Sequence, residues 1–361
     1  MRAGAVTTAA LALALLGQTC SRAVVRPGGA GSSVADAGSA SHFVDSAGAP
    51  LPQWSFIWER LHAYYGASTP ETITVVLKGS GASHGFHPPS RSIFLAPGAD
   101  AEVVAHESTH LCNFELTRGA SNTLPFRFID EGLANIMASR IAGDGGGYKA
   151  CALAAARQES LKGELSLARV QDWRVYFGDP KRRPSALNRR AYEVGASFVF
   201  MLEDTRGSDA LRAFLMDIGR TRDIEKTSQS VFSSTAKRLE EDWLRYLERV
   251  EVDASTPAVI EMSPPDRAAE VPLGLGEIWV TFSTPMYPRI CVTTPCGDTG
   301  VCYTNAAWKP GNRLVIQVDG SLKPGHSYDL LLGSERGGCH LTSCAGAALP
   351  FVRWRFTTAD R

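Results

Sequence analysis

Apolar residues recur at helical spacing through most of the chain up to about residue 250. In the segment WSFIWERLHAYYG, Phe56, Ile57, Leu61 and Tyr64 follow this spacing. Similar patterns predict helices over 99–116, 126–143, 147–157, 187–205, 207–219 and 234–250. Asp100 is placed to cap the helix over 99–116, and the glycine-rich stretch 144–147 to end the helix over 126–143. This part of the chain is therefore expected to be mostly helical.

Two short apolar runs near the front of this part predict strands, namely ITVVL at 73–77 and SIFLA at 92–96. The segment GSGASHGFHPPSR between them predicts a loop. Its residues His84 and His87 have a spacing that could suit a metal, but the surrounding Gly and Pro favour a solvated loop. These two strands predict a small sheet. SIFLA is its expected edge strand, to which an extended peptide can add through backbone hydrogen bonds.

The pattern changes after the proline-bearing segment DASTPAVIEMSPPD. Beyond it, apolar and polar residues alternate in EIWVTF, RLVIQVD, HSYDLLL and FVRWRFTT, which predicts strands separated by turns. The predicted fold class is therefore α+β: a mostly helical domain over 52–252 with a small N-terminal sheet, and an all-β sandwich over 256–361.

The N-terminus predicts export. Met1 and Arg2 precede an apolar run of about fifteen residues, the length of a signal peptide core, so residues 1–23 are expected to be a signal peptide. The sequence LLGQTC also resembles a lipoprotein processing site, which would make Cys20 a lipid anchor to a membrane. Residues 24–51 are rich in Gly, Ser and Ala and predict a flexible linker.

Charge and composition narrow the function classes. Lys plus Arg number 37 and Asp plus Glu number 37, so the net charge is zero and no nucleic-acid partner is expected. The hydrophobic content of 44% is enough for a folded core. Eight cysteines fit an oxidising compartment.

The segment HESTH carries the chemistry. Residues four apart share one face of a helix, so His106 and His110 can bind one cation while Glu107 reaches a water on it. This spacing is typical of a zinc site. A catalytic zinc keeps three protein ligands and an open position, so a third ligand is needed.

Glu131, 21 residues after His110 in FIDEGLAN, is the predicted third ligand. Asp130 is the alternative, and its other role would be a favourable charge in the first turn of the helix. Asn135, one turn past Glu131, could accept the Nδ1 proton of His106 and fix its tautomer.

These motifs resemble the gluzincin zinc metallopeptidases, and most of all the bacterial peptidase MA-like domains. The similarity covers about 54–250 and includes ITVVL, SIFLAP, HESTH, DEGLAN, RRAYEVGASFVFMLEDTRG and EEDWLRYLERV. It implies that Tyr192, about sixty positions after the ligand Glu131, donates to the tetrahedral oxyanion. A core aromatic is the alternative role of Tyr192. Two departures are Asn135, where such enzymes commonly have Asp, and the lack of a GxMEN-type motif, which argues against a dedicated aminopeptidase.

Together with the predicted signal peptide, the resemblance implies an exported bacterial zinc metallopeptidase that is periplasmic, outer-membrane-anchored or secreted. It would hydrolyse peptide bonds with a zinc-activated water and Glu107 as general base. The alternatives are a cell-surface binding or adhesion protein, in which this domain is a non-catalytic scaffold, and a zinc enzyme with a non-peptide substrate.

The segment PAVIEMSPPDRAAEVPLGLGEIWVTFSTPMYPR and the closing WRFTT resemble bacterial Ig-like domains of the SbsA type, over roughly 256–360. Five cysteines lie in this part, without a CxxC pair, so disulfides are favoured over a second zinc site: Cys291, Cys296, Cys302, Cys339 and Cys344. Cys112 and Cys151 could form a further bridge, although the sequence does not determine the pairing.

Overall fold

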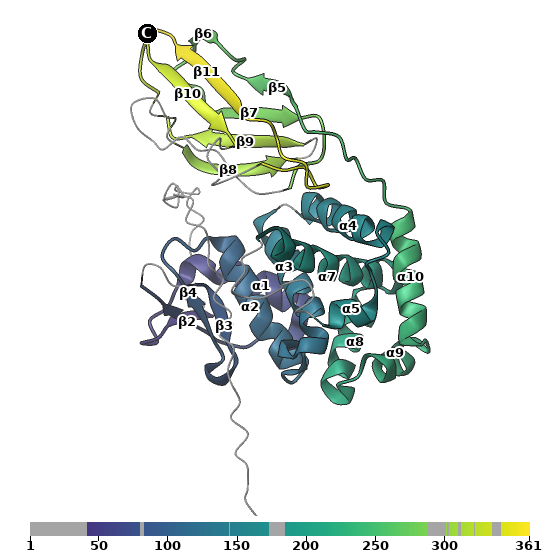
Figure 1. Cartoon of the computed structure of the whole chain (residues 1–361). Coiled ribbons are helices and arrows are strands. Elements are labelled where there is room, and N and C mark those ends of the chain that lie inside the picture. The colour runs from purple at the N-terminus through teal and green to yellow at the C-terminus, as the bar shows by residue number, and fades with distance from the viewer. Residues whose placement is uncertain are drawn as a thin grey trace, which may run out of the picture.

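The computed structural model describes residues 42–79, 83–143, 145–172, 185–287, 301, 303–309, 312–320, 322–333 and 341–361. In this part of the chain the elements form a helical region, residues 42–250, and a C-terminal β region, residues 259–361 (Figure 1). Each region has its own hydrophobic core. The predicted α+β class is thus confirmed. Among the residues described, no helix has the length and apolar character needed to span a bilayer.

Nine helices are described in the helical region. They are α1 (Ser55–Tyr65), α2 (Ala101–Leu116), α3 (Arg127–Ala142), α4 (Gly145–Leu161), α5 (Leu167–Gln171), α7 (Ser185–Arg206), α8 (Ser208–Thr221), α9 (Ile224–Phe232) and α10 (Ala236–Glu248). Every predicted helix is present, although α4 begins inside the glycine-rich stretch. The α3 helix ends where Gly143 adopts a left-handed conformation. Only the short α5 and the polar α9, which Asp223 caps, were not predicted.

A four-stranded sheet packs beside α2. Its strands are β1 (Phe43–Asp45), β2 (Ile73–Leu77), β3 (Gly85–His87) and β4 (Ser92–Leu95), in the order β1-β2-β4-β3. The two predicted strands are confirmed as β2 and β4, which pair in parallel. The expectation of a loop over 79–91 is wrong at β3, which pairs antiparallel with β4. SIFLA is therefore an interior strand, and β3 is an edge of the sheet.

The other edge strand, β1, lies in the segment expected to be a flexible linker. Phe43 is fully buried, and β1 pairs in parallel with β2. The apolar Phe43 and Val44 supply the burial that a Gly/Ser-rich linker lacks. The linker prediction is therefore wrong for residues 43–45, while residues 1–41 lie outside the described part of the chain.

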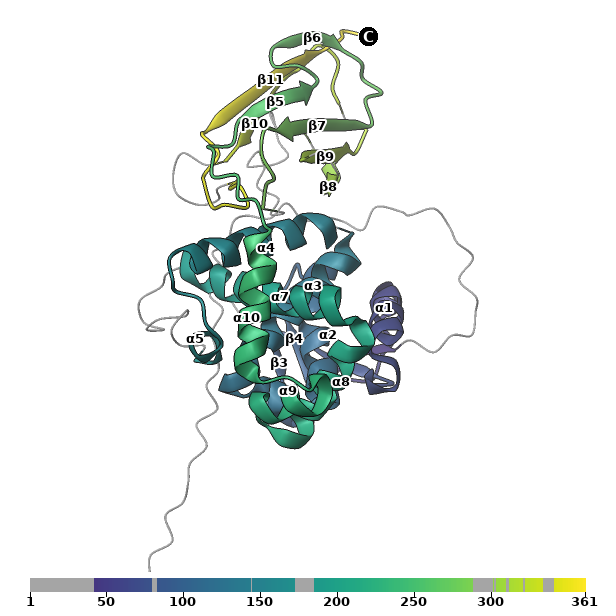
Figure 2. The same cartoon turned by 90° about the vertical axis from the view of Figure 1, so that its right-hand side faces the viewer.

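The C-terminal β region consists of two sheets around one core (Figure 2). Its strands are β5 (Val259–Ser263), β6 (Ala268–Val271), β7 (Glu277–Phe282), β8 (Tyr303–Lys309), β9 (Arg313–Val318), β10 (Ser327–Leu332) and β11 (Val352–Thr358). The sheets have the orders β10-β11-β6 and β5-β7-β9-β8. The four predicted strands are present as β7, β9, β10 and β11. Their inward side chains, such as Ile316 and Phe356, are almost fully buried.

A disulfide between Cys151 of α4 and Cys344 joins the two regions. The alternative bridge from Cys112 to Cys151 is therefore wrong, and Cys112 is a buried free thiol. Its pKa is raised by burial, so it stays protonated. Cys291, Cys296, Cys302 and Cys339 lie outside the described residues.

Candidate metal centre

The helix α2 presents the HESTH motif to the interior. The Asp100 side chain accepts a hydrogen bond from the Val103 backbone N–H at 3.0 Å and so fixes where this helix begins. His106 and His110 then lie one turn apart on the same face. The His106 side chain is 16% exposed, and Glu107 and His110 are buried. The motif therefore lies in a partly desolvated setting with one accessible imidazole.

The helix α3 packs against α2 and brings Glu131 to the two imidazoles. The Nε2 atoms of His106 and His110 are 3.1 Å apart. Glu131 Oε2 lies 3.4 Å from His106 Nε2 and 3.3 Å from His110 Nε2. The three predicted ligands thus converge through a tertiary contact between two helices.

These distances fit a tetrahedral metal. Zinc bonds of about 2.0–2.1 Å place neighbouring ligand atoms about 3.3–3.4 Å apart, close to the three separations here. Glu131 Oε2 is buried and faces both imidazoles without a well-aligned hydrogen bond among the described residues, and a cation between the three atoms would satisfy it. His106, His110 and Glu131 form the one such group of potential ligands in the described part of the chain. The donor set of two imidazoles and one carboxylate suits zinc.

Asp130 orients His110 and does not join the ligand atoms. Its Oδ2 accepts from His110 Nδ1 at 2.9 Å, which leaves Nε2 free to face Glu131. Its Oδ1 accepts from Asn113 Nδ2 at 2.8 Å, and Asn113 Oδ1 accepts from the Tyr65 hydroxyl at 2.7 Å. Burial disfavours the charged imidazole, but Asp130 and Glu131 outweigh it and raise the pKa of His110 to about 10 without a metal. The carboxylates thus make the centre attractive to a cation.

Arg127, which the sequence analysis missed, balances these carboxylates. Its guanidinium pairs with Glu131 Oε1 at 2.5 Å and with Asp130 Oδ2 at 3.2 Å. Burial opposes its charge, but Glu131 and Asp130 keep the pKa of Arg127 above its usual value. Arg127 also holds the pKa of Glu131 well below the usual value against the effect of burial. In the sequence, the ion pair between Arg127 and Glu131 is indicated only by their spacing of four residues, which is one helical turn.

The helix α7 places Tyr192 beside the centre. The rings of Tyr192 and His106 lie 6.3 Å apart in an edge-on arrangement. Burial, followed by the charges of Glu131 and Glu107, raises the pKa of Tyr192 well above its usual value, so its hydroxyl remains a donor at neutral pH. Tyr192 therefore lies beside His106 and within electrostatic reach of Glu131 and Glu107.

Two glycines allow α7 to approach α3 this closely. A Cβ on Gly195 would collide with the Phe128 carbonyl oxygen, and a Cβ on Gly132 with the backbone of Gly195. Only the absence of side chains at both positions allows the backbones to meet. Tyr192 lies one turn before Gly195 on α7, and Glu131 directly precedes Gly132 on α3. The crossing therefore brings these two side chains to the same part of the molecule.

The remaining candidates lie elsewhere. Asn135 is half-buried beside Tyr148 of α4, and no hydrogen bond joins it to His106 among the described residues. His84 Nδ1 accepts from the Ala96 backbone N–H at 3.1 Å, and His87 Nδ1 bonds the Ser90 hydroxyl at 2.7 Å. The structure thus gives both histidines local partners and does not bring them to a metal centre.

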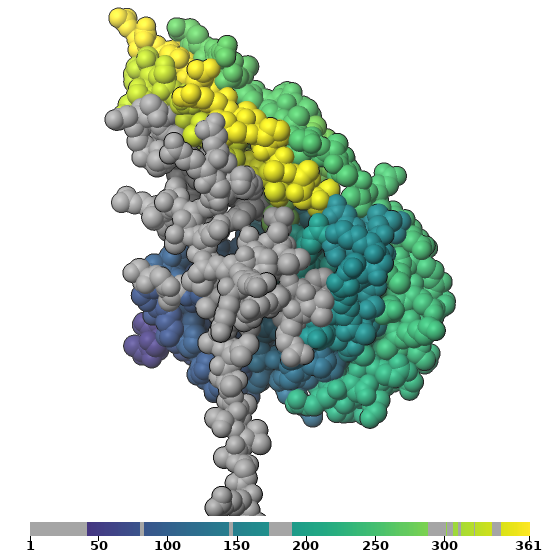
Figure 3. Space-filling model, in the orientation of Figure 1, coloured from purple at the N-terminus to yellow at the C-terminus, as the bar shows by residue number. Residues whose placement is uncertain are grey.

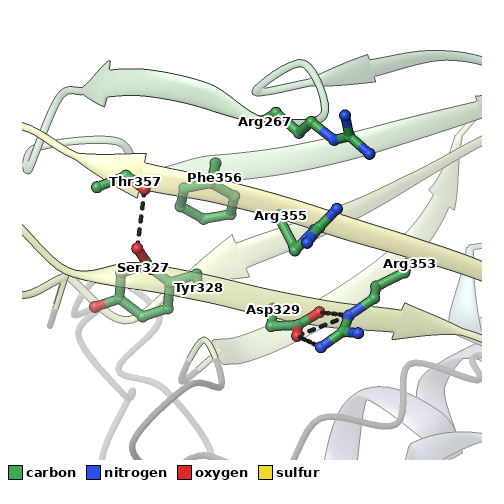
Figure 4. Close-up of a pocket in the computed structure, with 8 residues that line it drawn as sticks. All are labelled: Arg267, Ser327, Tyr328, Asp329, Arg353, Arg355, Phe356 and Thr357. Atoms are coloured by element: carbon green, nitrogen blue, oxygen red, sulfur yellow. Dashed lines mark hydrogen bonds and ion pairs between the residues drawn. The ribbon is translucent and has the colours of Figure 1, made fainter.

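The C-terminal β region has an open groove of about 720 Å³ over β10 and β11 (Figure 4). Arg267, Arg353 and Arg355 line it, and Asp329 pairs with Arg353. The groove contains no histidine or cysteine, and none of the candidate zinc ligands. It therefore lacks the chemistry of the centre between α2 and α3.

Comparisons with known proteins add little. No family model and no curated protein matches the chain. Among solved structures, it is similar to the N-terminal part of the bacterial S-layer protein SbsC, with 14% identity over 72% of this chain and 58% of that chain and a TM-score of 0.21. Domains 1–6 of SbsC match with 12% identity over 74% of this chain and 35% of that chain, also at 0.21. The chain thus spans less than two thirds of either structure, and the TM-scores are too low to support an argument.

Proposed function

We propose that this protein is an exported zinc-dependent metallopeptidase. The observation that carries the proposal is the convergence of His106 Nε2, His110 Nε2 and Glu131 Oε2 at separations of 3.1–3.4 Å, next to a buried Glu107. A structural zinc site is usually closed by four protein ligands, whereas a catalytic one keeps a position for water. Three ligands with an adjacent carboxylate therefore favour catalysis over a purely structural metal.

When bound, zinc would supply Lewis acidity and a water activated near neutral pH. Glu107 would accept a proton from the attacking water and deliver it to the leaving amine. Tyr192, kept protonated by burial and by the nearby carboxylates, would donate a hydrogen bond to the developing oxyanion. Asp130 would hold the His110 ring in place, and Arg127 would keep Glu131 ionised.

The free edge of the sheet supports a peptide substrate. Among the described strands, β3 is paired on one side, with β4, and lies at the edge of the sheet. The helix α2, which carries the zinc ligands, packs against β3 and β4. An extended peptide that paired with β3 would therefore run close to α2, and backbone pairing would make recognition partly independent of its sequence.

The disulfide between Cys151 and Cys344 supports export, because such bonds persist in oxidising compartments. The proposed location is outside the bacterial cytoplasm, with a lipid anchor at Cys20 as one form of attachment. We propose a β-sandwich of the Ig-like type for the C-terminal β region, from its two sheets around one core.

A comparison of Glu107→Gln with the wild-type protein tests this function. Both are loaded with zinc and incubated with a broad peptide library, and the cleavage products are identified by mass spectrometry. The variant should keep its zinc and lose about 10²–10⁴-fold in hydrolysis, the usual contribution of a general base. A chelator should abolish wild-type cleavage, and zinc should restore it. Zinc binding without cleavage by either protein would favour the non-catalytic scaffold, and equal cleavage by both would exclude Glu107 as the base.

A further inference from the structure

A short segment of the C-terminal β region leaves the two sheets and reaches the helical region. This segment, Pro285–Tyr287, pairs with residues 342–344: the Tyr287 backbone N–H donates to the Thr342 carbonyl at 2.8 Å, and the Cys344 N–H donates to the Pro285 carbonyl at 2.8 Å. Met286 and Ser343 form an antiparallel bridge between them. Backbone pairing therefore fixes the position of Tyr287 relative to Cys344.

The helix α4 holds this paired unit at two points. One is the disulfide between Cys151 and Cys344, beside which the Met286 carbonyl oxygen lies 3.6 Å from Cys151 Sγ. The other is a hydrogen bond of 2.9 Å from Gln158 Nε2 to the Ala345 carbonyl. Gln158 Oε1 in turn accepts from Arg190 of α7 at 3.1 Å. Both ribbon views place α4 at the junction of the two regions, and their surfaces meet there (Figure 3).

This attachment brings Tyr287 to the neighbourhood of the candidate metal centre. Tyr287 is half-buried and packs against the hydrophobic core of the helical region. It lies within electrostatic reach of Tyr148 on α4 and of Tyr192 on α7. Tyr192 in turn faces the His106 ring at 6.3 Å. Tyr192 thus has the His106 ring as a neighbour on one element and an aromatic residue of the other region within electrostatic reach.

We propose that Tyr287 forms part of the surface that binds the substrate next to the metal centre, and that the Cys151–Cys344 disulfide holds it there. The inference rests on the proposed peptidase function and deepens it. A partly exposed tyrosine offers apolar area and stacking to a large side chain, so the ligand that Tyr287 recognises is an aromatic residue beside the scissile bond. The C-terminal β region would then take part in selecting the substrate.

Zinc-binding hydroxamates test this inference without requiring hydrolysis. The affinities of acetohydroxamate and of 3-phenylpropanohydroxamate, which adds only a benzyl group, are measured on the zinc-loaded full chain by calorimetry. In Tyr287→Ala the benzyl compound should bind about three- to tenfold more weakly, and acetohydroxamate should bind as before. The matched control is Tyr246→Ala, which removes a tyrosine of α10 that bonds Asp204 on the protein exterior. Equal affinity of the benzyl compound for wild type and Tyr287→Ala would overturn the inference.

The disulfide is tested with the double variant Cys151→Ser and Cys344→Ser. It should lose the same preference for the benzyl compound and keep its zinc affinity, which shows that the helical region is still folded. If this variant does not fold, Gln158→Leu removes the second attachment and should weaken the benzyl compound about two- to threefold. Full preference in the folded variants would overturn the role of the attachment. Failure of the wild-type protein to bind zinc would overturn the proposed function and this inference with it, whereas zinc binding with equal hydroxamate affinities would overturn the inference alone.

Discussion

The two regions of the molecule differ in what they bury. Among its described residues, the helical region buries six acidic or histidine side chains: Glu107, His110, Asp130, Glu131, Glu159 and Glu193. The described residues of the C-terminal β region bury no acidic, basic or histidine side chain, and their buried polar side chains are hydroxyls such as those of Thr281, Thr284, Ser343 and Thr358. Both regions have large apolar cores, so the difference does not come from how well they pack.

This difference assigns the acid–base and metal chemistry to the helical region. A charge removed from water costs several kcal/mol unless it is paired or binds a metal. Four of the six buried groups gather around one point between α2 and α3. In the C-terminal β region, the Arg353–Asp329 pair lies on the outer face, where a charge costs little. Buried charge therefore locates the candidate site as clearly as the motif does.

The largest expected effect comes from removing a ligand. Structural zinc binds with about 10–16 kcal/mol shared among a few ligands, so His110→Ala should weaken zinc binding about a thousandfold, as measured by competition with a chromophoric chelator. His87→Ala is the matched control, because that exposed histidine lies on β3. If zinc affinity survived in His110→Ala, the contrast between the regions would lose its functional meaning.

A core substitution in the C-terminal β region should affect stability and leave the metal alone. Trp354 is fully buried, and its Nε1 donates to the Pro264 carbonyl at 2.8 Å. Trp354→Ala should lower the unfolding free energy of this region by about 3–5 kcal/mol, as measured by urea denaturation. Zinc affinity under native conditions should stay at the wild-type value. A parallel loss of zinc affinity would show that the two regions do not have separate roles.

A smaller effect is expected from Asp130→Asn. The new amide oxygen can still accept a hydrogen bond from Asn113 or His110. The substitution nevertheless removes the negative charge that orients and polarises His110. Zinc affinity should fall about 10–100-fold, as for other partners of metal-bound histidines. Asp172→Asn, which changes a carboxylate just after α5, is the control. An unchanged affinity in Asp130→Asn would reduce Asp130 to a packing role.

The smallest effect concerns the exposed pair on β10 and β11. Arg353 lowers the pKa of Asp329 below its usual value, so the pair stabilises the folded state above the unfolded pKa of about 4 and loses this contribution as the pH falls through the lowered value. Asp329→Asn should therefore cost at most about 1 kcal/mol at pH 7, with less difference from wild type at pH 3. A urea titration at both pH values measures this. A loss that grew in acid would contradict the assigned sign.

The parts of the fold that local sequence determines were predicted well. The Asp100 cap, the helical spacing of the apolar residues and HESTH lie within a few turns of each other, so α2 and two of the ligands follow from the local sequence. The interior strands β2 and β4 are β-branched or apolar runs of the expected length.

The parts that depend on distant contacts were not predicted. The strand β3 has only three residues, and it is stabilised by pairing with β4 rather than by its own sequence. The same holds for the pairing of Cys151 with Cys344, which are 193 residues apart. Asp130 and Glu131 are adjacent in the sequence, and only the crossing of α2 and α3 gives the first to His110 Nδ1 and the second to the ligand group.

The proposed function depends on His106, His110 and Glu131 holding one zinc ion with room for a water. X-ray absorption at the zinc edge of the purified full chain tests this most directly, together with the zinc content per chain. We expect one zinc bound by nitrogen and oxygen atoms alone at about 2.0–2.1 Å, with the scattering of two imidazoles. A sulfur ligand at about 2.3 Å, or a chain that takes up no zinc, would contradict it.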